Sequence, residues 1–378
     1  MRRARPRRSV LGCLGAMVVM VLLVAAAAEV ALRIADWRAG RDADFFLPHQ
    51  DMSQAQYEPH PYLGLVQRPG WDKREQPAEE KGRHYQVHIN ALGLRGAETT
   101  REKPPGVYRI ICIGGSTTFG TGATSDDKSY PARLQALLNH LANTGHAPEG
   151  IRYEVLNGGV SGYNSIDSLI NLELRLVELQ PDAVIDYDAG NDGRIIQTSD
   201  FQPDYSNARR PPPIIELSGL ERFLLGHCRI YAHLVRGTDP EKQLGTLANW
   251  IFVPGWEQQS VSNLVWVNEY GLSVFGRNLR QICAVARAAG AQPVLQTFAS
   301  RLADDPTYPE LGVFLARANQ VIHDLGAELD VPVVPTAETL TGRSELYDDA
   351  MHFTDTGELA HARAVVEFAL KQGLFGLH

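Results

Sequence analysis

The stretch YRIICIGGSTTFGTG, Tyr108–Gly122, joins a run of β-forming residues to a short turn rich in glycine and hydroxyl groups. The apolar run stops at Gly114 and Gly115, and Ser116 follows directly. Glycine lets the backbone approach other groups closely because it carries no Cβ. The stretch therefore predicts a buried strand that ends by presenting one serine at the edge of a sheet.

Strand and helix patterns alternate along the rest of the chain. The five predicted strands are Tyr108–Ile113, Tyr153–Leu156, Ala183–Tyr187, Pro293–Phe298 and Val331–Val334. Between them apolar residues recur with helical spacing, as at Leu134, Leu138 and Leu141. Nearly continuous apolar strands that alternate with helices indicate a parallel sheet with helices on both faces.

Two of the helical segments carry signals for their ends. The first contains Leu134 and is expected to stop at Gly145, since glycine favours the left-handed conformation that ends many helices. In the second, Ser165 is the N-cap candidate and Pro181 is expected to end the helix.

The N-terminus has the composition of a membrane anchor. Five arginines (Arg2, Arg3, Arg5, Arg7 and Arg8) precede the uncharged run Ser9–Ala28, whose twenty residues suffice to span a bilayer. The arginine cluster should stay in the cytoplasm, which places everything after about Arg33 on the extracytoplasmic, periplasmic side. A cleaved signal peptide is the alternative, because Ala25–Ala28 offers small residues for a peptidase, and the protein would then be secreted. The length of the run favours a retained anchor.

Charge and motif content exclude several partners. Residues 1–33 carry a net charge of +5 and the whole chain −8, so the remaining 345 residues carry −13. A body this acidic repels phosphate backbones, and we expect no nucleic-acid partner. No Cys/His/Asp spacing indicates a metal, and GGSTTFGTG lacks the Lys-Ser/Thr ending of a phosphate-binding loop, so no cofactor is implied. The sequence is compatible both with a disulfide between Cys228 and Cys283 and with two free thiols.

The chain divides into an N-terminal segment, an extension and one large domain. The predicted parts are residues 1–33 (cytoplasmic tip and transmembrane anchor, or signal peptide), 34–84 (linker and extension) and 85–378 (the large α/β domain). Within the large domain, Tyr85–Gly96 reads as a small hairpin around an Asn-Ala-Leu-Gly turn.

An insertion of about 75 residues, at about 194–270, interrupts the rhythm of strands and helices. It contains the helical pattern LERFLLGHCRIYAHLVR and three tryptophans, Trp250, Trp256 and Trp266. Such a length exceeds that of an ordinary loop. We interpret it as a lid or substrate-shaping subdomain, with a merely decorative extension as the alternative.

Chemically useful residues follow the predicted strands. Ligands of open parallel sheets bind beyond the carboxyl ends of the strands. The residues placed there are Ser116 after the first strand, Gly162 after the second, Asn191 after the third, and Asp349 and His352 beyond the fifth. One serine, amide donors and an Asp-x-x-His pair together point to acyl transfer through a serine nucleophile.

Each of these residue types has a defined chemical task. A serine hydroxyl becomes a useful nucleophile when a base such as His352 accepts its proton. A carboxylate three residues earlier, Asp349, can orient the imidazole and stabilise its charged form. The backbone N–H groups of Ser116 and Gly162 and the side-chain amide of Asn191 are suited to bind the oxyanion of the tetrahedral intermediate.

These motifs resemble those of the SGNH, or GDSL-type, hydrolases. The matching blocks are GGSTTFG, NGGVSGYNS, GND and DAMH, in the family's order, and HINALGLRG resembles a segment of the membrane-anchored bacterial members. The resemblance implies a three-layer α/β/α fold with five parallel strands in flavodoxin-like order. It also implies that Ser116 is the nucleophile, His352 the base, Asp349 its orienting acid, and Ser116, Gly162 and Asn191 the oxyanion hole.

The chain departs from the family pattern at two positions. The family's usual aspartate before the serine is Gly115 here, and the glycine two residues before Asn191 is Ala189. The first change removes a side chain that normally helps to hold the serine loop. Among competing acids, Asp348 and Asp355 also lie near His352, but Asp349 has the family spacing. His323 and His361 fall within helical patterns and are expected to be surface or packing residues.

The sequence therefore predicts an extracytoplasmic serine esterase that acts on short acyl groups of carbohydrates or small esters. Two alternatives use the same residues differently. An O-acyltransferase would pass the acyl group to a cell-surface polysaccharide, with the aromatic insertion excluding water. A glycan-binding or assembly module with weak or no catalysis would retain only the fold.

Overall fold

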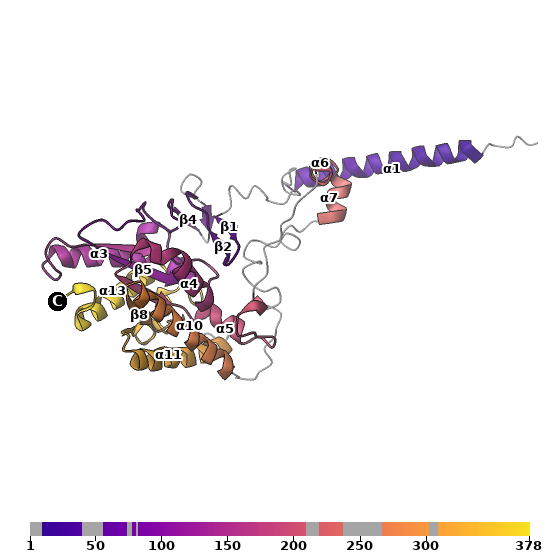
Figure 1. The fold of residues 1–378 in the computed structure, drawn as a ribbon. Helices are drawn as coiled ribbons and strands as arrows, with labels where there is room; N and C mark the ends of the chain where they lie inside the picture. The colour runs from indigo at the N-terminus through magenta and orange to yellow at the C-terminus, as the bar shows by residue number, and fades with distance from the viewer. Residues whose placement is uncertain are drawn as a thin grey trace, which may run out of the picture. The chain divides into compact units, whose positions relative to one another are not determined.

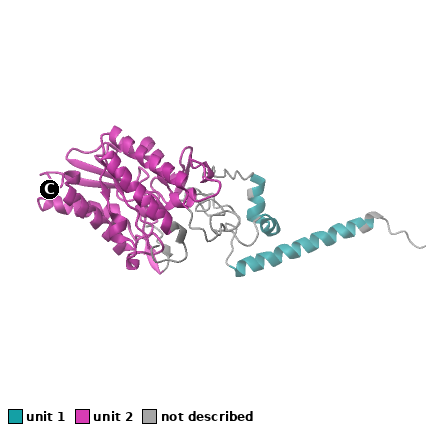
Figure 2. Ribbon diagram, turned by 90° about the horizontal axis from the view of Figure 1, so that it is seen from below, with its two compact units in different colours: residues 1–53, 213–247 teal, residues 54–212, 248–378 magenta. Residues whose placement is uncertain are grey.

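The computed structural model describes residues 10–39, 56–73, 78–80, 82–208, 219–236, 267–301 and 309–378. The chain forms two compact units, residues 1–53 with 213–247 and residues 54–212 with 248–378 (Figure 2). Trp250, Trp256 and Trp266, which were assigned to the aromatic part of the insertion, lie outside the described residues.

The larger unit is built on a five-stranded parallel sheet (Figure 1). Its strands are β5 (Val107–Gly114), β6 (Arg152–Asn157), β7 (Ala183–Tyr187), β8 (Gln292–Gln296) and β9 (Val333–Val334). The strand order is β6-β5-β7-β8-β9, with every neighbouring pair parallel. This order, 2-1-3-4-5 in chain sequence, is the flavodoxin-like topology, so the predicted fold is confirmed.

Helices cover both faces of this sheet. They are α2 (Ser116–Phe119), α3 (Tyr130–Asn143), α4 (Ser165–Asn171), α5 (Gly190–Ile196), α10 (Glu269–Ala288), α11 (Pro309–Leu329), α12 (Thr336–Leu340) and α13 (Asp355–Gln372). Successive side chains of β5 point to opposite faces. Accordingly Ile110 packs with the apolar residues of α3 and α13, whereas Ile111 packs with those of α4, α10 and α11.

Two strands differ from the prediction: β9 starts later than expected, and β8 ends earlier. β9 contains only Val333–Val334, because Pro332 has no N–H to donate to a neighbouring strand. β8 ends at Gln296, because the N–H of Phe298 leaves the sheet and donates to the side chain of Asn319. The other three strands agree with the predicted ones within one residue at each end.

The ends of two helices test the capping signals. α3 stops at Asn143, and Gly145 follows with a positive φ of 84° as expected. Ser165 is not the N-cap of α4: the Asn164 side chain accepts the N–H groups of Ile166 and Asp167, and Ser165 begins the helix. An asparagine side chain caps as well as a serine.

The end predicted at Pro181 is confirmed. α4 continues as a π-helical turn (Leu172–Leu176) and a 3₁₀ turn (Val177–Leu179), and Gln180 adopts a left-handed conformation just before the proline.

The stretch expected to be linker contains four short strands. β1 (Tyr57–His60) pairs with β2 (Gly64–Gln67), and β3 (Ala78–Glu80) pairs with β4 (Arg83–Tyr85), both antiparallel. Strands of three or four residues with proline and charges have no measurable period, which is why the sequence did not reveal them. The predicted Asn-Ala-Leu-Gly turn is present: isolated bridges join Ile89 to Arg95, and Arg95 to Asn157 at the end of β6.

The smaller unit consists of α1 (Val10–Arg38), α6 (Gly219–His227) and α7 (Arg229–Arg236). By length and composition, Leu14–Arg38 could cross a membrane, and a signal sequence would meet the same criteria. The Glu29 carboxylate accepts the first backbone N–H groups of α7, those of Arg229 and Ile230, at 2.8 and 2.9 Å. Asp36, two turns further along α1, contacts His233 of α7 at 2.9 Å.

The helical pattern of the insertion is thus two helices broken at Cys228. Cys228 and Cys283 both carry free thiols, and Cys283 is buried in the core of the larger unit.

Candidate active site

Ser116 lies where β5 ends, as the first residue of the four-residue helix α2. The structure gives a physical reason for the glycine before it. A Cβ at Gly115 would lie 2.8 Å from both the Asn191 Nδ2 and the Tyr163 carbonyl oxygen, closer than side-chain carbons approach such atoms. The missing aspartate therefore leaves no gap, because groups from two other strand ends occupy that space.

Ser116, His352 and Asp349 form a continuous chain of hydrogen bonds. The His352 Nε2 lies 2.7 Å from the Ser116 Oγ, and the His352 Nδ1 lies 2.7 Å from the Asp349 Oδ2. The other carboxylate oxygen of Asp349 accepts the backbone N–H groups of Met351 and His352, both at 2.9 Å. Residues 236 positions apart in the sequence, Ser116 and His352, are thus in direct contact.

The electrostatics of Asp349 favour its charged form. Burial alone raises the pKa of this carboxyl, but the hydrogen bond and charge of His352, together with the two backbone N–H groups, outweigh burial and hold the pKa well below its ordinary value. An ionised carboxylate on Nδ1 keeps the proton on that nitrogen and leaves Nε2 free to accept one from Ser116.

The two competing acids have other partners. Asp348 forms an ion pair with Arg83 at 2.6 Å. Asp355 accepts the backbone N–H of Thr124 at 2.8 Å and pairs with Lys128 at 2.9 Å. Asp349 alone of these three acids is recorded within hydrogen-bond distance of the His352 ring in the described part of the chain.

The candidate oxyanion donors follow strands β5, β6 and β7, and Asn191 lies beside Ser116. The Asn191 Nδ2 donates one N–H to the Tyr163 carbonyl at 2.8 Å, and its second N–H has no recorded acceptor among the described residues. Gly162, with a positive φ of 90°, precedes Tyr163 directly. The backbone N–H groups of Ser116 and Gly162 likewise have no recorded acceptor in the residues that the structure describes.

A group of buried acids behind Asn191 was not recognised from the sequence. Asp186, Asp188 and Asp192 are all buried, on β7 and the segment after it. Burial and the mutual repulsion of these carboxylates raise the pKa of Asp186 to about 7 and that of Asp188 well above its ordinary value. The three acids in DYDAGND were the available signal.

Asp192 has a clear structural role. Its carboxylate accepts the Ser165 hydroxyl at 2.5 Å and the Tyr205 hydroxyl at 2.8 Å, which links the turn carrying Asn191 to α4. Burial raises the pKa of Asp192, and these hydrogen bonds oppose that rise.

His361 and His323 are a packing residue and a surface residue, respectively, as expected. His361 is fully buried, stacks on Tyr130 at a ring-centroid distance of 4.0 Å, and contacts Gln296 through Nε2 at 2.9 Å. Burial lowers the pKa of His361 to about 3, so it stays neutral. His323 is on the surface, 2.7 Å from Glu338.

A small cavity opens beside the serine. Its volume is about 10 Å³, room for about one water molecule, and its lining includes Ser116, Tyr163, Asn191, Phe298 and Met351. A larger cavity of about 650 Å³ runs along the edge strand β6 and is lined by residues such as Arg95, Asp126 and Glu154. The lining of the larger cavity contains none of the five predicted site residues.

Comparison with known proteins shows which family the chain matches. The family model described as GDSL-like Lipase/Acylhydrolase matches residues 112–360. A search of curated proteins finds no match.

Several solved structures are similar to the chain. The acetylxylan esterase Axe2 from Geobacillus stearothermophilus is 15% identical with a TM-score of 0.42, over 69% of this chain and 93% of that one. The lipase/acylhydrolase from Enterococcus faecalis is 15% identical with a TM-score of 0.40, over 70% and 96%. TesA is 16% identical with a TM-score of 0.40, over 69% and 97%.

Proposed function

Because this chain belongs to the GDSL-like lipase/acylhydrolase family, and is therefore an ester-bond hydrolase, we propose that it is a serine esterase that removes short acyl groups from carbohydrates or other small esters. The observation that carries the proposal is the hydrogen-bonded chain from Ser116 through His352 to Asp349, with 2.7 Å at each step. Serine, imidazole and carboxylate in this order form a nucleophile that a base activates and an acid orients.

The proposed reaction has two halves. The Ser116 Oγ attacks the ester carbonyl carbon while the His352 Nε2 takes the hydroxyl proton. The tetrahedral intermediate collapses, the alcohol leaves with the proton from His352, and Ser116 keeps the acyl group. Water then attacks the acyl-enzyme and gives a proton to His352, and the carboxylic acid is released as the proton returns to Ser116.

The oxyanion donors act in both halves. The N–H groups of Ser116 and Gly162, and the Asn191 N–H that does not bind Tyr163, would donate hydrogen bonds to the negatively charged carbonyl oxygen. Donors that are already fixed in place stabilise developing charge without reorganising. The bond between Asn191 and the Tyr163 carbonyl supports this role, because it fixes the orientation of the amide.

The cavity beside Ser116 is too small for a long acyl chain. It holds about 10 Å³, and Phe298 and Met351 contribute apolar surface to it. Ser116 and His352 are themselves half-buried, so a bulky alcohol part can remain outside while its acyl group enters.

We also propose that the N-terminal helix is a retained anchor that holds the enzyme on the extracytoplasmic side of a membrane. α1 is continuous through the candidate cleavage site Ala25–Ala28, and contacts of Glu29 with α7 begin at the next residue. A helix held in this way does not offer the extended backbone that a peptidase needs. An N-terminal epitope tag should stay on the membrane-bound protein, and its loss during maturation would contradict a retained anchor.

The experiment that tests the proposed function compares the full chain with its Ser116→Ala variant on p-nitrophenyl esters of increasing acyl length. We expect hydrolysis of the acetyl ester, and a loss of at least ~10⁴-fold in kcat in the variant. A fluorophosphonate probe should label the parent chain and not the variant. Unchanged hydrolysis in the variant would refute the nucleophile, and absence of labelling in the parent would favour a binding module.

Product analysis distinguishes hydrolysis from transfer. With a polysaccharide acceptor present, an esterase should release free acid at the same rate as without it. A shift of the acyl group to the polysaccharide would instead identify an O-acyltransferase that uses the same acyl-enzyme.

A further inference from the structure

The turn that carries Ser116 is too short to be stable by itself. α2 has four residues, and Gly120 ends it in a left-handed conformation with its N–H donated to the Ser116 carbonyl at 2.9 Å. Forming one helical turn is unfavourable in isolation, and the last carbonyl groups of a helix have no partner within it. Something outside α2 must therefore bind its C-terminal carbonyls and keep Ser116 in place.

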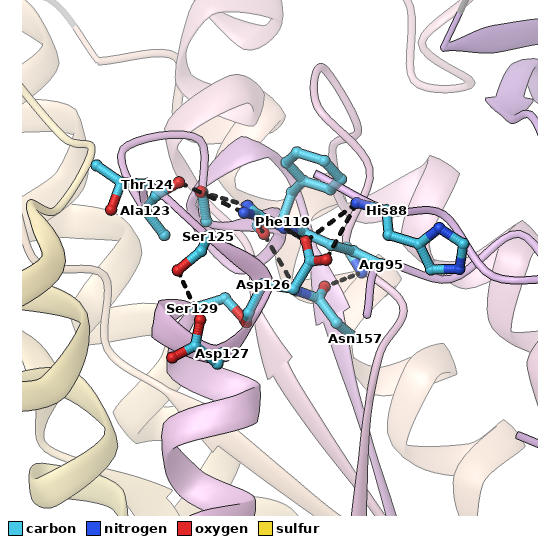
Figure 3. Close-up of polar contacts among 12 residues, drawn as sticks. His88, Arg95, Phe119, Ala123, Thr124, Ser125, Asp126, Asp127, Ser129 and Asn157 are labelled. Carbon is cyan, nitrogen blue, oxygen red and sulfur yellow. Dashed lines mark hydrogen bonds and ion pairs between the residues drawn. The ribbon is translucent and has the colours of Figure 1, made fainter. Parts of the chain in front are cut away.

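Arg95 binds carbonyl oxygens at the C-terminal end of α2 and just beyond it (Figure 3). Its Nη1 donates to the carbonyl oxygens of Phe119 at 3.0 Å and Gly120 at 2.6 Å, and its Nη2 donates to that of Ala123 at 3.4 Å. The guanidinium lies 4.8 Å from the centre of the Phe119 ring. The side chain is only 1% exposed, so these bonds are made away from water.

Arg95 is itself held rigidly. Its Nε donates to the Asp126 Oδ1 at 3.0 Å, and Asp126 also accepts the backbone N–H of His88 (Figure 3). In the turn before Arg95, the Asn90 side chain accepts the N–H groups of Leu92 and Leu94, both at 3.0 Å. The predicted hairpin therefore works as a platform that fixes one arginine under the serine turn.

A second contact acts on the same carbonyl. The Asn157 Nδ2 donates to the Phe119 carbonyl at 3.1 Å, while its Oδ1 accepts the N–H of Gly159. The loop after β6, which leads to Gly162, is thereby connected to the turn that carries Ser116.

We propose that Arg95 is a positioning residue of the esterase: by binding the carbonyls of Phe119, the last residue of α2, and of the C-cap residue Gly120, it holds the Ser116 Oγ against His352 and the Ser116 N–H toward the oxyanion. The positive charge also suits the negative end of a helical turn. Because no side chain fits at Gly115, the residue before Ser116 cannot support the turn with a side chain. Arg95 instead binds the C-terminal end of the turn. The proposal rests on Ser116 being the nucleophile, which the Ser116→Ala variant tests separately.

The test compares Arg95→Met and Arg95→Lys with a matched control, Arg109→Met. Arg109 is also fully buried, pairs with Glu154 at 2.6 Å and donates to the Arg101 and Leu179 carbonyls, but it lies at the amino end of β5. Full-length proteins are assayed well below their melting temperatures, and kcat, KM and the rate constant of fluorophosphonate labelling are normalised to the folded fraction.

We expect Arg95→Met to lower kcat and the labelling rate by about 10²-fold with little change in KM, since a displacement of about 1 Å has that effect on a reacting group. Arg95→Lys keeps the charge but not the forked geometry, and should lose about tenfold. Arg109→Met should lose stability and keep its kcat.

Wild-type kcat in folded Arg95→Lys or Arg95→Met would overturn the proposal, because Arg95 would then serve stability alone. If Arg95→Met does not fold, Arg95→Lys decides. An equal loss of kcat in Arg109→Met would also overturn it. If the parent chain itself is not labelled at Ser116, the proposed function fails before any Arg95 variant is compared.

Discussion

The two ends of strand β5 are both rich in buried polar groups, yet they use them differently. At the amino end, Arg109 binds Glu154 and two carbonyls, and its own backbone N–H donates to Asp182 at 2.7 Å. At the carboxyl end, Arg95 is satisfied in the same way. Beside it, however, the backbone N–H of Ser116 has no recorded acceptor among the described residues.

This difference separates stability from function. Buried polar groups are ordinarily hydrogen-bonded, and leaving one unpaired has a cost in free energy. Within the described residues, the N–H groups of Ser116 and Gly162 and one N–H of Asn191 have no acceptor, and all three lie on segments that follow strands at the carboxyl edge of the sheet. N–H donors without an acceptor beside the proposed nucleophile Ser116 are suited to bind the negative charge that would develop in the proposed reaction.

The largest expected effect is that of Asp349→Asn. The amide keeps the size of the carboxylate but presents an N–H to the His352 Nδ1, which favours the wrong tautomer. We expect kcat to fall by about 10⁴-fold, and the melting temperature to decrease because the charged carboxylate also stabilises the fold. The matched control is Asp348→Asn, whose parent residue pairs with Arg83 instead. If Asp349→Asn retained more than about a tenth of the activity, Asp349 would not orient His352 as proposed.

Much of the fold could be predicted because both faces of the sheet are buried. Continuous apolar runs such as those of β5 and β7 give strands whose bounds agree with the structure within one residue. The capping of α4 was misassigned because Asn164 and Ser165 are equally good caps, and only the use of the Ser165 hydroxyl by Asp192 distinguishes them. The sequence did not predict β1 to β4, because these strands are stabilised by tertiary contacts and show no periodic pattern of apolar residues.

Ser116, Gly162 and Asn191 could be named because each follows a strand closely, and Asp349 and His352 because they form an Asp-x-x-His motif ahead of the last helix. Arg95 could not, because nothing in its own neighbourhood shows that it reaches the carbonyls of residues 24 to 28 positions later. The raised pKa of Asp186 and Asp188 likewise depends on burial that a single sequence does not reveal. Local patterns thus identify groups that must be exposed to a substrate better than groups that support them.

The second prediction concerns Asn191→Ala, which removes one donor from the carboxyl end. The developing oxyanion would lose one hydrogen bond, and we expect kcat to fall by about 10²- to 10³-fold. The side chain also donates to Tyr163, so a modest decrease in melting temperature should accompany the loss. Labelling by the fluorophosphonate should slow in parallel with ester hydrolysis. A change in KM with unchanged kcat would mean that the amide binds the substrate and not the transition state.

The smallest effect on kcat should come from Asp355→Asn. Asp355 also lies near the carboxyl end of β5, but both of its carboxylate oxygens already accept hydrogen bonds. Its carboxylate binds the N–H and hydroxyl of Thr124 and the ammonium of Lys128. Burial raises the pKa of Asp355, but these partners outweigh burial and lower it. Its charge therefore stabilises the folded chain above the ordinary pKa of an aspartate, and that contribution is lost as the pH falls through the lowered value.

We accordingly expect Asp355→Asn to be less stable than the parent by about 1 kcal/mol at pH 7, with a smaller difference at an acidic pH below the ordinary pKa of an aspartate. Thermal unfolding at both pH values measures this. The loss of kcat should stay below about tenfold, far from that of Asp349→Asn, although the two acids are only three residues from His352 on either side. If the two variants lost activity equally, position near the imidazole would matter more than unused hydrogen-bonding capacity, and the contrast between the ends of β5 would lose its meaning.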